Sequence, residues 1–508
     1  MPCRTLSSAR FLFAILYAKE KDMKLIYGIE AKPPIGKSLL FAFQQMIAIM
    51  AATLLVPMLM SGMKTHDGAS LVFDPAAALF GAGIGTIVYL LFTKRKSPVF
   101  LGSSFTFLGA YEAVIGQNYG YWGVIIGICF AGLVYVAIAL IVKAVGSGWV
   151  NKLLPAVIIG PIVALIGLSL SGTATSWVST NGGTTYNLLS ILCGLVTFLV
   201  IVLASVKGGK TMKLIPFIIG IGAGYLLALI FTVIGKIANV EYMQLLNFQP
   251  FIDTFGDFRF TSIFDYPKFT FLKAIQSGGE YPIDGVAVAN IALIFIPIGI
   301  VELAQHIADH KNLSSIVDRD LITNPGLDKT LLGDGIGSIV GGFFGGAANT
   351  TYGESIGCVA ITKNASIVTI LYAAIGCVLL SFFTPFVTVI NSIPKCVMGG
   401  ACIALYGFIA VSGLQMLKQV DLNDSKNLFV VSAILVIGIG GLTLDFGFNK
   451  LTGGPLFQIT ALATALIVGL LTNLLVHIGN HNDQNPSGDL LSESVGDEEM
   501  LSEFEEQE

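Results

Sequence analysis

Several polar side chains lie within strongly apolar stretches of the 508-residue chain, where they could bind a polar molecule or hold a proton. One of them is Glu354, in the short segment 350–362. Four others recur at helical spacing near the end of an apolar stretch and would share one helix face: Glu302, Gln305, His306 and Asp309. Charged groups are costly at membrane depth and are usually functional there. We therefore expect Glu354 and this face to line a polar cavity.

Metal and enzyme chemistry are disfavoured by what surrounds these residues. His306 and His310 have the spacing of a metal-binding pair, but no third ligand accompanies them. We interpret His310 as an interfacial histidine near cytoplasmic water. The seven cysteines lie mostly in apolar runs without a CxxC pair, so they are expected to be small core residues. No nucleophile–base pair stands out, which disfavours an enzyme. A channel would need pore-lining residues repeated across subunits, so a channel is disfavoured as well. We predict neither a metal nor another cofactor.

Composition places these residues in a membrane protein. Hydrophobic residues make up 54% of the chain, charged residues only 12%, and the mean hydropathy is +0.80. A soluble domain carries roughly 25% charged residues. Two Gly-, Ser- and Thr-rich segments, 98–114 and 350–362, are too short for ordinary spans and bring the expected total to about fourteen. The other windows are long and apolar enough to cross a bilayer: 38–60, 75–93, 120–142, 152–171, 187–206, 213–235, 286–305, 329–347, 366–390, 396–416, 428–444 and 456–478.

Basic residues indicate the orientation. By the positive-inside rule, their distribution puts both termini in the cytoplasm of a protein of the cell membrane. The predicted cytoplasmic lead is 1–36, of which 1–22 are expected to be dispensable, and the acidic tail 479–508 is expected to be disordered. The basic residues gather in alternate loops on one side: Lys94, Arg95, Lys96, Lys143, Lys152, Lys207, Lys210, Lys213, Lys311, Arg319, Lys329, Lys363, Lys418 and Lys426.

The chain contains an internal repeat. Gly81–Val88 (GAGIGTIV) matches Gly333–Val340 (GDGIGSIV), and Leu154–Gly160 matches Ile393–Gly399 at a Pro and a Gly five residues apart. Matched segments are seven spans apart in the predicted order, and an odd repeat unit inserts its second copy upside down. We therefore expect an all-α polytopic membrane fold built from a 7+7 inverted repeat.

Inverted repeats of this kind are typical of secondary transporters, which hold their substrate at the bilayer midplane between a corresponding pair of broken segments. Residues 37–236 and 286–478 would form the two repeats, with a folded external hairpin or helix at 237–285 between them. Irregular backbone inside a membrane is tolerated where it lines a cavity. The short segments 98–114 and 350–362 are therefore the expected site, and the alternative is that they are re-entrant structural loops.

Four segments resemble one known family. The run Asn349–Lys363 (NTTYGESIGCVAITK) and the preceding Ala304–His310 (AQHIADH) resemble the nucleobase–ascorbate transporters, and among them most of all the bacterial uracil permeases. Leu101–Phe107 (LGSSFTF) and Gln44–Pro57 (QQMIAIMAATLLVP) agree with this, and the resemblance covers residues 30–478.

The resemblance implies a fold and an activity. It implies two seven-span repeats divided between a core and a gate domain, with short strands in segments 3 and 10 and a homodimeric assembly. The implied function is import of a nucleobase, uracil above all, by proton symport with an elevator or rocking motion of core against gate. A xanthine or purine (urate) permease of the same family is the alternative, although such members carry Gln-Asn where this chain has Glu354-Ser355. No nucleic-acid partner is expected.

The resemblance also implies roles for individual residues. Glu354 and the Gly353 backbone would bind one edge of the base. Gln305 stands where uracil permeases usually have Glu, and an amide offers a donor and an acceptor without titrating. Proton coupling is therefore assigned to Glu354 or Asp309. The remaining predicted substrate-site residues come from four segments: Ala52, Phe105, Tyr352, Ser355 and Tyr406.

Overall fold

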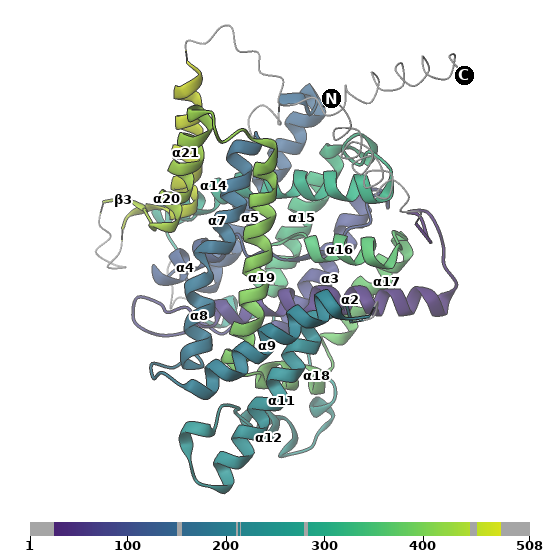
Figure 1. Cartoon of the computed structure of the whole chain (residues 1–508), viewed down its shortest axis with the longest axis vertical. Coiled ribbons are helices and arrows are strands. Elements are labelled where there is room, and N and C mark those ends of the chain that lie inside the picture. The colour runs from purple at the N-terminus through teal and green to yellow at the C-terminus, as the bar shows by residue number, and fades with distance from the viewer. Residues whose placement is uncertain are drawn as a thin grey trace, which may run out of the picture.

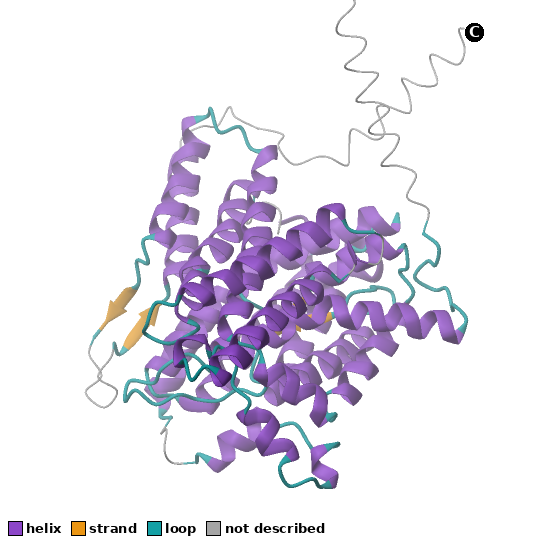
Figure 2. Ribbon diagram, turned by 60° about the horizontal axis from the view of Figure 1, so that its bottom comes forward, coloured by secondary structure: helices purple, strands orange, loops and turns teal. Residues whose placement is uncertain are grey.

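A computed structural model describes residues 25–149, 155–209, 212–213, 215–278, 283–447 and 455–478. The predicted dispensable stretch 1–22 and the predicted acidic tail 479–508 lie outside these residues. Helices dominate the described part of the chain (Figure 2). Eight helical segments within it are long and apolar enough to cross a membrane: α2 (Ile35–Met60), α3 (Pro75–Phe92), α5 (Gly120–Val145), α7 with α8 (Ala156–Ser169 and Ser171–Thr180), α9 (Leu188–Lys207), α11 (Pro216–Ile237), α14 (Gly285–Val317) and α19 (Lys395–Met416).

Further helices complete the bundle. Three are apolar but shorter: α17 (Ile367–Leu380), α20 (Ser425–Ile439) and α21 (Ala461–His477). A glycine-rich helix, α15 (Leu327–Gly345), follows the π-helical turn η3 (Ile322–Gly326). Large apolar side chains face outward from several helices, for example Leu226 on α11 and Phe429 on α20. An apolar exterior over apolar spanning helices is what lipid requires, so the protein is a multi-pass membrane protein.

The two glycine-rich repeat segments pack directly against each other, as α3 and α15. A Cβ atom at Gly81 would overlap the carbonyl oxygen of Gly341, and one at Gly85 would lie 2.8 Å from the carbonyl oxygen of Gly337. Because no side chain separates the two backbones, the helices approach more closely than larger residues would permit. The glycines that identify the repeat in the sequence are therefore the residues that join its two copies.

The second repeat-related pair also meets in space. A Cβ atom at Gly167 of α7 would overlap the backbone of Tyr406 on α19, and one at Gly413 of α19 would overlap the backbone of Ala164 on α7. In Figure 1 these two helices run side by side through the middle of the molecule. Both helices begin after a proline, Pro155 and Pro394, which is suited to a helix start and not to its interior.

The third repeat-related pair is formed by the two short segments. Residues Leu101–Ser103 (β1) and Asn349–Thr351 (β2) pair as antiparallel strands, with Gly102 opposite Thr350. Each strand leads into a short helix, α4 (Leu108–Gly116) or α16 (Gly353–Thr362). The ribbon β1–β2 is completely buried, and the largest apolar core of the molecule surrounds it. A second hairpin, β3 (Leu444–Phe446) with β4 (Phe457–Ile459), lies at the edge of the molecule (Figure 2).

The segment between the two repeats is folded. It contains α12 (Gln249–Phe255) and α13 (Thr270–Gln276), with the 3-10 turns η1 (Glu241–Met243) and η2 (Phe260–Ser262). A further 3-10 turn, η4 (Leu417–Gln419), follows α19. Figure 1 shows α12 at the end of the molecule beyond α11.

The prediction of one span over 366–390 is wrong. In the structure α17 ends at Leu380, and a separate helix, α18 (Thr384–Ser392), begins after the extended residue Phe383. Pro385 in the first turn of α18 explains the break, because proline is tolerated at a helix start and disrupts a helix interior. α18 packs against α12, and the hydroxyl groups of Thr254 and Thr388 are 3.0 Å apart. We call α12, α13 and α18 the connector end.

Candidate functional site

The strand ribbon is held by contacts that reach across the two repeats. The ring of Tyr352 occupies the space that a side chain at position 102 would need, so only glycine fits in β1 there. The Tyr352 hydroxyl group donates a hydrogen bond of 3.4 Å to the carbonyl oxygen of Ser103. On the other side, the backbone N–H of Ala348 donates to the Tyr111 hydroxyl group at 2.7 Å. These contacts fix the positions from which α4 and α16 begin.

The helices α4 and α16 both begin at the ribbon, at its opposite ends, because the strands are antiparallel. A helix N-terminus leaves backbone N–H groups without partners inside the helix and carries a partial positive charge. Phe105 precedes α4, and Glu354 is the second residue of α16. The two predicted residues therefore flank one ribbon, and each stands beside a helix N-terminus at membrane depth.

The start of α16 borders open space. Gly353, its first residue, is exposed, and Glu354 is half-buried. A Cβ atom placed on Gly353 would meet no atom within 4 Å. This end of α16 therefore offers a carboxyl group and the N-terminal backbone of a helix to a small molecule.

Aromatic groups close to the ribbon come from two repeats. Phe105 and Tyr406 are buried and meet edge to face, with ring centroids 5.7 Å apart. The Tyr406 hydroxyl group lies beside the Cys402 thiol, and no described residue satisfies it with ordinary hydrogen-bond geometry. Ala52 and Tyr352 belong to the same buried cluster as these two rings. The contact between Phe105 and Tyr406 therefore brings two of the predicted site residues together.

Unsatisfied polar atoms gather around the ribbon. Besides Tyr406, the described residues leave the hydroxyl group of Ser103 and the amide of Asn349 without hydrogen-bond partners. Both residues lie on the two strands. Buried polar groups in native proteins are normally paired. A polar ligand between the two broken segments would satisfy them.

Helix α14 runs past the ribbon with its polar face toward it. Asp309 accepts a hydrogen bond of 3.3 Å from the hydroxyl group of Thr351, on β2. Glu354 lies within electrostatic range of Asp309. Gln305 is half-buried on the same helix. The predicted proton-coupling candidates, Glu354 and Asp309, are therefore near each other.

Sequence reasoning gave Glu302 no role, although it recognised the face to which Glu302 belongs. Its carboxyl group is buried and accepts a hydrogen bond of 3.2 Å from Ser104, the residue after β1. The hydroxyl groups of Thr106 and Thr350 form further side-chain hydrogen bonds to it. The helical spacing of Glu302, Gln305 and Asp309 was the available signal, but spacing alone does not identify the partners across the fold.

The interpretation of His310 as a histidine near water is wrong. His310 is completely buried, and its Nε2 atom lies 2.8 Å from the Tyr89 hydroxyl group. His306 is equally buried, between Asp334 at 2.6 Å and Thr330 at 3.1 Å. The partners come from α3 and α15, and no local pattern around the histidines reveals them.

Ser355 forms hydrogen bonds within the protein. Its hydroxyl group receives hydrogen bonds from the Gln45 side chain on α2 and, at 3.0 Å, from the backbone N–H of Phe100. The side chain is fully buried. Ser355 thus ties α16 to α2 and to the start of β1, and its predicted contact with substrate stays a prediction.

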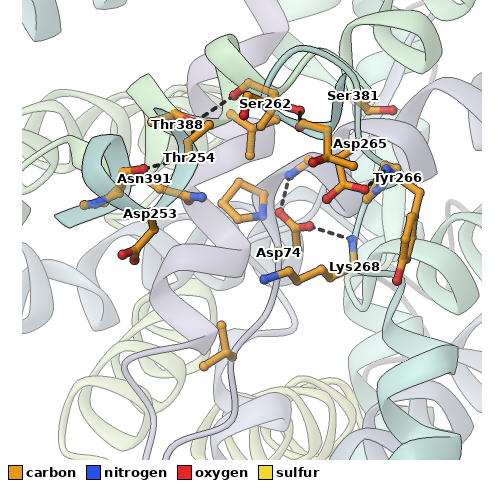
Figure 3. Close-up of a pocket in the computed structure, with 18 of the residues that line it drawn as sticks. Asp74, Asp253, Thr254, Ser262, Asp265, Tyr266, Lys268, Ser381, Thr388 and Asn391 are labelled. Carbon is orange, nitrogen blue, oxygen red and sulfur yellow. Dashed lines mark hydrogen bonds between the residues drawn. The ribbon is translucent and has the colours of Figure 1, made fainter. Parts of the chain in front are cut away.

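The connector end holds a separate cavity of about 700 Å³ (Figure 3). Asp74 lies at its wall, where its carboxyl group accepts hydrogen bonds from the backbone N–H groups of Ala76, at 2.9 Å, and Lys268, at 2.7 Å. The residues that line this cavity come from the start of α3, α12, α18 and the segment between α12 and α13. None of them is a predicted site residue, so this cavity is distinct from the ribbon site.

The fold is that of membrane transporters of known structure. The transmembrane domain of the cyanobacterial bicarbonate transporter BicA aligns with a TM-score of 0.55 and 16% sequence identity, covering 88% of this chain and 100% of that domain. The murine anion transporter Slc26a9, in its inward-facing state, aligns with a TM-score of 0.55 and 12% identity over 94% of this chain and 73% of its own. At these identities the likeness concerns the fold alone.

A sequence model of the permease family that includes xanthine and uracil permeases matches residues 36–446, and the chain belongs to this family. The uracil permease of Bacillus caldolyticus is 36% identical over 457 residues, which are 89% of this chain and 95% of that protein. The uracil permease of Escherichia coli K12 is 32% identical over 451 residues, or 88% and 95% of the two chains. The protein is therefore a membrane transporter and not an enzyme.

Proposed function

We propose that this protein imports a nucleobase, with uracil as its substrate, across the cell membrane. The observation that carries the proposal is the open N-terminus of α16, where the Glu354 carboxyl group stands beside the exposed Gly353. Uracil presents an N–H donor between two carbonyl acceptors. A carboxyl group with adjacent backbone N–H groups can pair with such an edge. The 32–36% identity to permeases named for uracil supports the same substrate.

The residues proposed to contact the base suit a flat, neutral ring. Phe105 and Tyr406 supply aromatic surface, and the unpaired Tyr406 hydroxyl group supplies a polar contact. Gln305 offers both a donor and an acceptor. No described Lys or Arg contacts the ribbon, and a phosphate or carboxylate ligand would need such a group. We propose that the base lies between the Phe105 and Glu354 ends of the ribbon.

The proposed transport cycle couples uracil to protons, with Glu354 and Asp309 as proton-binding candidates.

We propose about fourteen membrane segments in two inverted sets. Helices α2–α5 and α14–α17 would form the core, and α7–α11 and α19–α21 would form the gate. The core would move against the gate in an elevator or rocking motion. Both termini would be cytoplasmic, the connector end external, and the protein a homodimer.

Uptake by purified protein in liposomes tests the function. With an inward proton gradient, labelled uracil should accumulate, an uncoupler should abolish the accumulation, and excess xanthine should compete weakly. Glu354→Gln should lose most uptake. The matched control is Glu112→Gln, since Glu112 is an exposed acid on α4. Uptake of xanthine in preference to uracil, or unchanged proton-linked uptake in Glu354→Gln, would contradict the proposal.

A further inference from the structure

Glu302 is a buried carboxyl group that touches both broken segments. Ser104 and Thr106 reach it from the chain that follows β1, and Thr350 reaches it from the middle of β2. Asp309, one of the two proposed proton carriers, bonds the β2 side, through Thr351. Glu302 is thus placed to sense the arrangement of the two segments relative to each other and to α14.

The partners of Glu302 are neutral. Its hydrogen bonds come from three hydroxyl groups, and no basic side chain acts on it among the residues that the structure describes. A charged carboxylate in a low-dielectric interior is costly unless a counter-charge balances it, whereas a protonated carboxyl group is not. The titratable groups that act on it from the surrounding helices are acids or phenols: Asp309 on α14, Asp334 on α15, Tyr111 on α4 and Tyr135 on α5. Such an environment favours reversible binding of a proton.

We propose that Glu302 is a further proton-coupling residue of this transporter, acting through the hydroxyl groups of both broken segments and without touching the substrate. This inference rests on the proposed function and deepens it. When Glu302 is ionised, it accepts hydrogen bonds from all three hydroxyl groups. When it binds a proton, one of its oxygens becomes a donor, and one hydroxyl group turns its own proton elsewhere. Proton occupancy therefore changes the bonds that hold the two segments.

The position of Glu302 is consistent with the presence of Gln305 where uracil permeases usually have Glu. The two residues are three positions apart, on one face of α14. Gln305 cannot release a proton, so the carboxyl groups nearest to it on α14 lie one turn away on either side, at Glu302 and Asp309. The two acids have different surroundings, because Glu302 is bonded to hydroxyl groups of the protein while Glu354 is half-buried beside the exposed Gly353.

The first test uses Glu302→Gln in liposomes, with two readouts. Exchange of labelled for unlabelled uracil without a proton gradient should stay within about twofold of wild type, because substrate contacts are intact. Accumulation driven by a proton gradient should fall to the equilibrium level. The double variant Glu302→Gln/Gln305→Glu should regain a large part of the accumulation, since it returns a titrating group to the same helix face. Glu112→Gln is the matched control.

Each alternative result has a clear meaning. If wild-type protein exchanges no uracil, the proposed function fails. If wild type accumulates uracil and Glu302→Gln does so equally, the role of Glu302 alone is overturned. Loss of both exchange and accumulation in a folded Glu302→Gln protein would also overturn it, by making Glu302 a binding or structural residue. If wild type exchanges uracil but a proton gradient never drives its accumulation, the role of Glu302 in proton coupling is overturned as well.

A second variant keeps the inference testable if Glu302→Gln does not fold. Thr350→Val removes one donor to the ionised carboxyl group and preserves the acid. Losing a donor that favours the charged form should move the pH midpoint of uptake to higher pH, by roughly half a unit or more. Thr464→Val is the control, because Thr464 is equally buried on α21 and bonds only its own helix. An unchanged pH profile in Thr350→Val would overturn the proposal.

Discussion

Nδ1 of His306 on α14 lies 2.6 Å from Oδ2 of Asp334 on α15, and both side chains are completely buried. His306 also stacks on His310, with ring centroids 4.1 Å apart, and His310 in turn bonds Tyr89 on α3. The polar network therefore joins α14 to both glycine-packed helices beside the strand ribbon. It fixes the position of α14, which carries Gln305 and Asp309, relative to β2.

His306→Ala should destabilise the protein. It would leave Oδ2 of the buried Asp334 without its histidine partner, and an unsatisfied buried polar group costs about 1–3 kcal/mol. Thermal unfolding in detergent should show a clearly lower midpoint than wild type. His477→Ala, at an exposed helix end, should not change the midpoint. Equal midpoints for the two variants would contradict the structural role of His306.

Gly341→Ala should disrupt the contact between the two repeats. The added methyl group would overlap the side chain of Asn349 and press on the carbonyl oxygen of Gly81, neither of which can move freely. Overpacking of this kind costs about 1–3 kcal/mol. Gly222→Ala provides the control, since a Cβ atom there meets nothing within 4 Å. If Gly341→Ala unfolds at the same temperature as Gly222→Ala, α3 and α15 do not pack as described.

Gly353→Val should separate binding from stability. The new side chain enters open space, so the unfolding midpoint should stay close to that of wild type. It would also occupy the space in front of the α16 N-terminus, and uracil affinity should fall roughly tenfold or more, or ~1.4 kcal/mol. Equilibrium binding of labelled uracil to purified protein measures this. Wild-type affinity in a folded Gly353→Val protein would place the substrate elsewhere.

Tyr406→Phe should weaken uracil binding without weakening the fold. Its hydroxyl group is buried beside the Cys402 thiol, which is a weak hydrogen-bond partner, so its removal should cost little stability. If the base satisfies it, affinity should fall about threefold to tenfold. Tyr186→Phe, at an exposed tyrosine, is the control. A Tyr406→Phe protein that is less stable, with affinity unchanged, would refute the predicted contact.

Much of the architecture was predictable because local sequence patterns determine it. The glycines at 81–85 and 333–337 identify the repeat, and small residues at regular spacing predict close helix packing. The short segments 98–114 and 350–362 stood out because they are polar and short within an apolar chain. Their positions, and that of the acid at 354, followed from the same contrast.

Other features depend on partners that are distant in sequence. Glu302 and Ser104 are 198 positions apart, and His310 and Tyr89 are 221 apart, so no local pattern shows that they are bonded. Ser355 has the polarity of a site residue, but its hydroxyl group is engaged by Gln45 and Phe100. The division of 366–390 into two helices was missed because apolar composition outweighed Pro385 in the sequence reading.

A structure determined with uracil bound would test the central claim most directly. We predict the ring between the Phe105 and Glu354 ends of the strand ribbon, with one edge within hydrogen-bond distance of the Glu354 carboxyl group and the backbone at Gly353. Uracil bound only in the cavity at the connector end, or a Glu354 side chain that faces lipid with no base near the ribbon, would contradict the account.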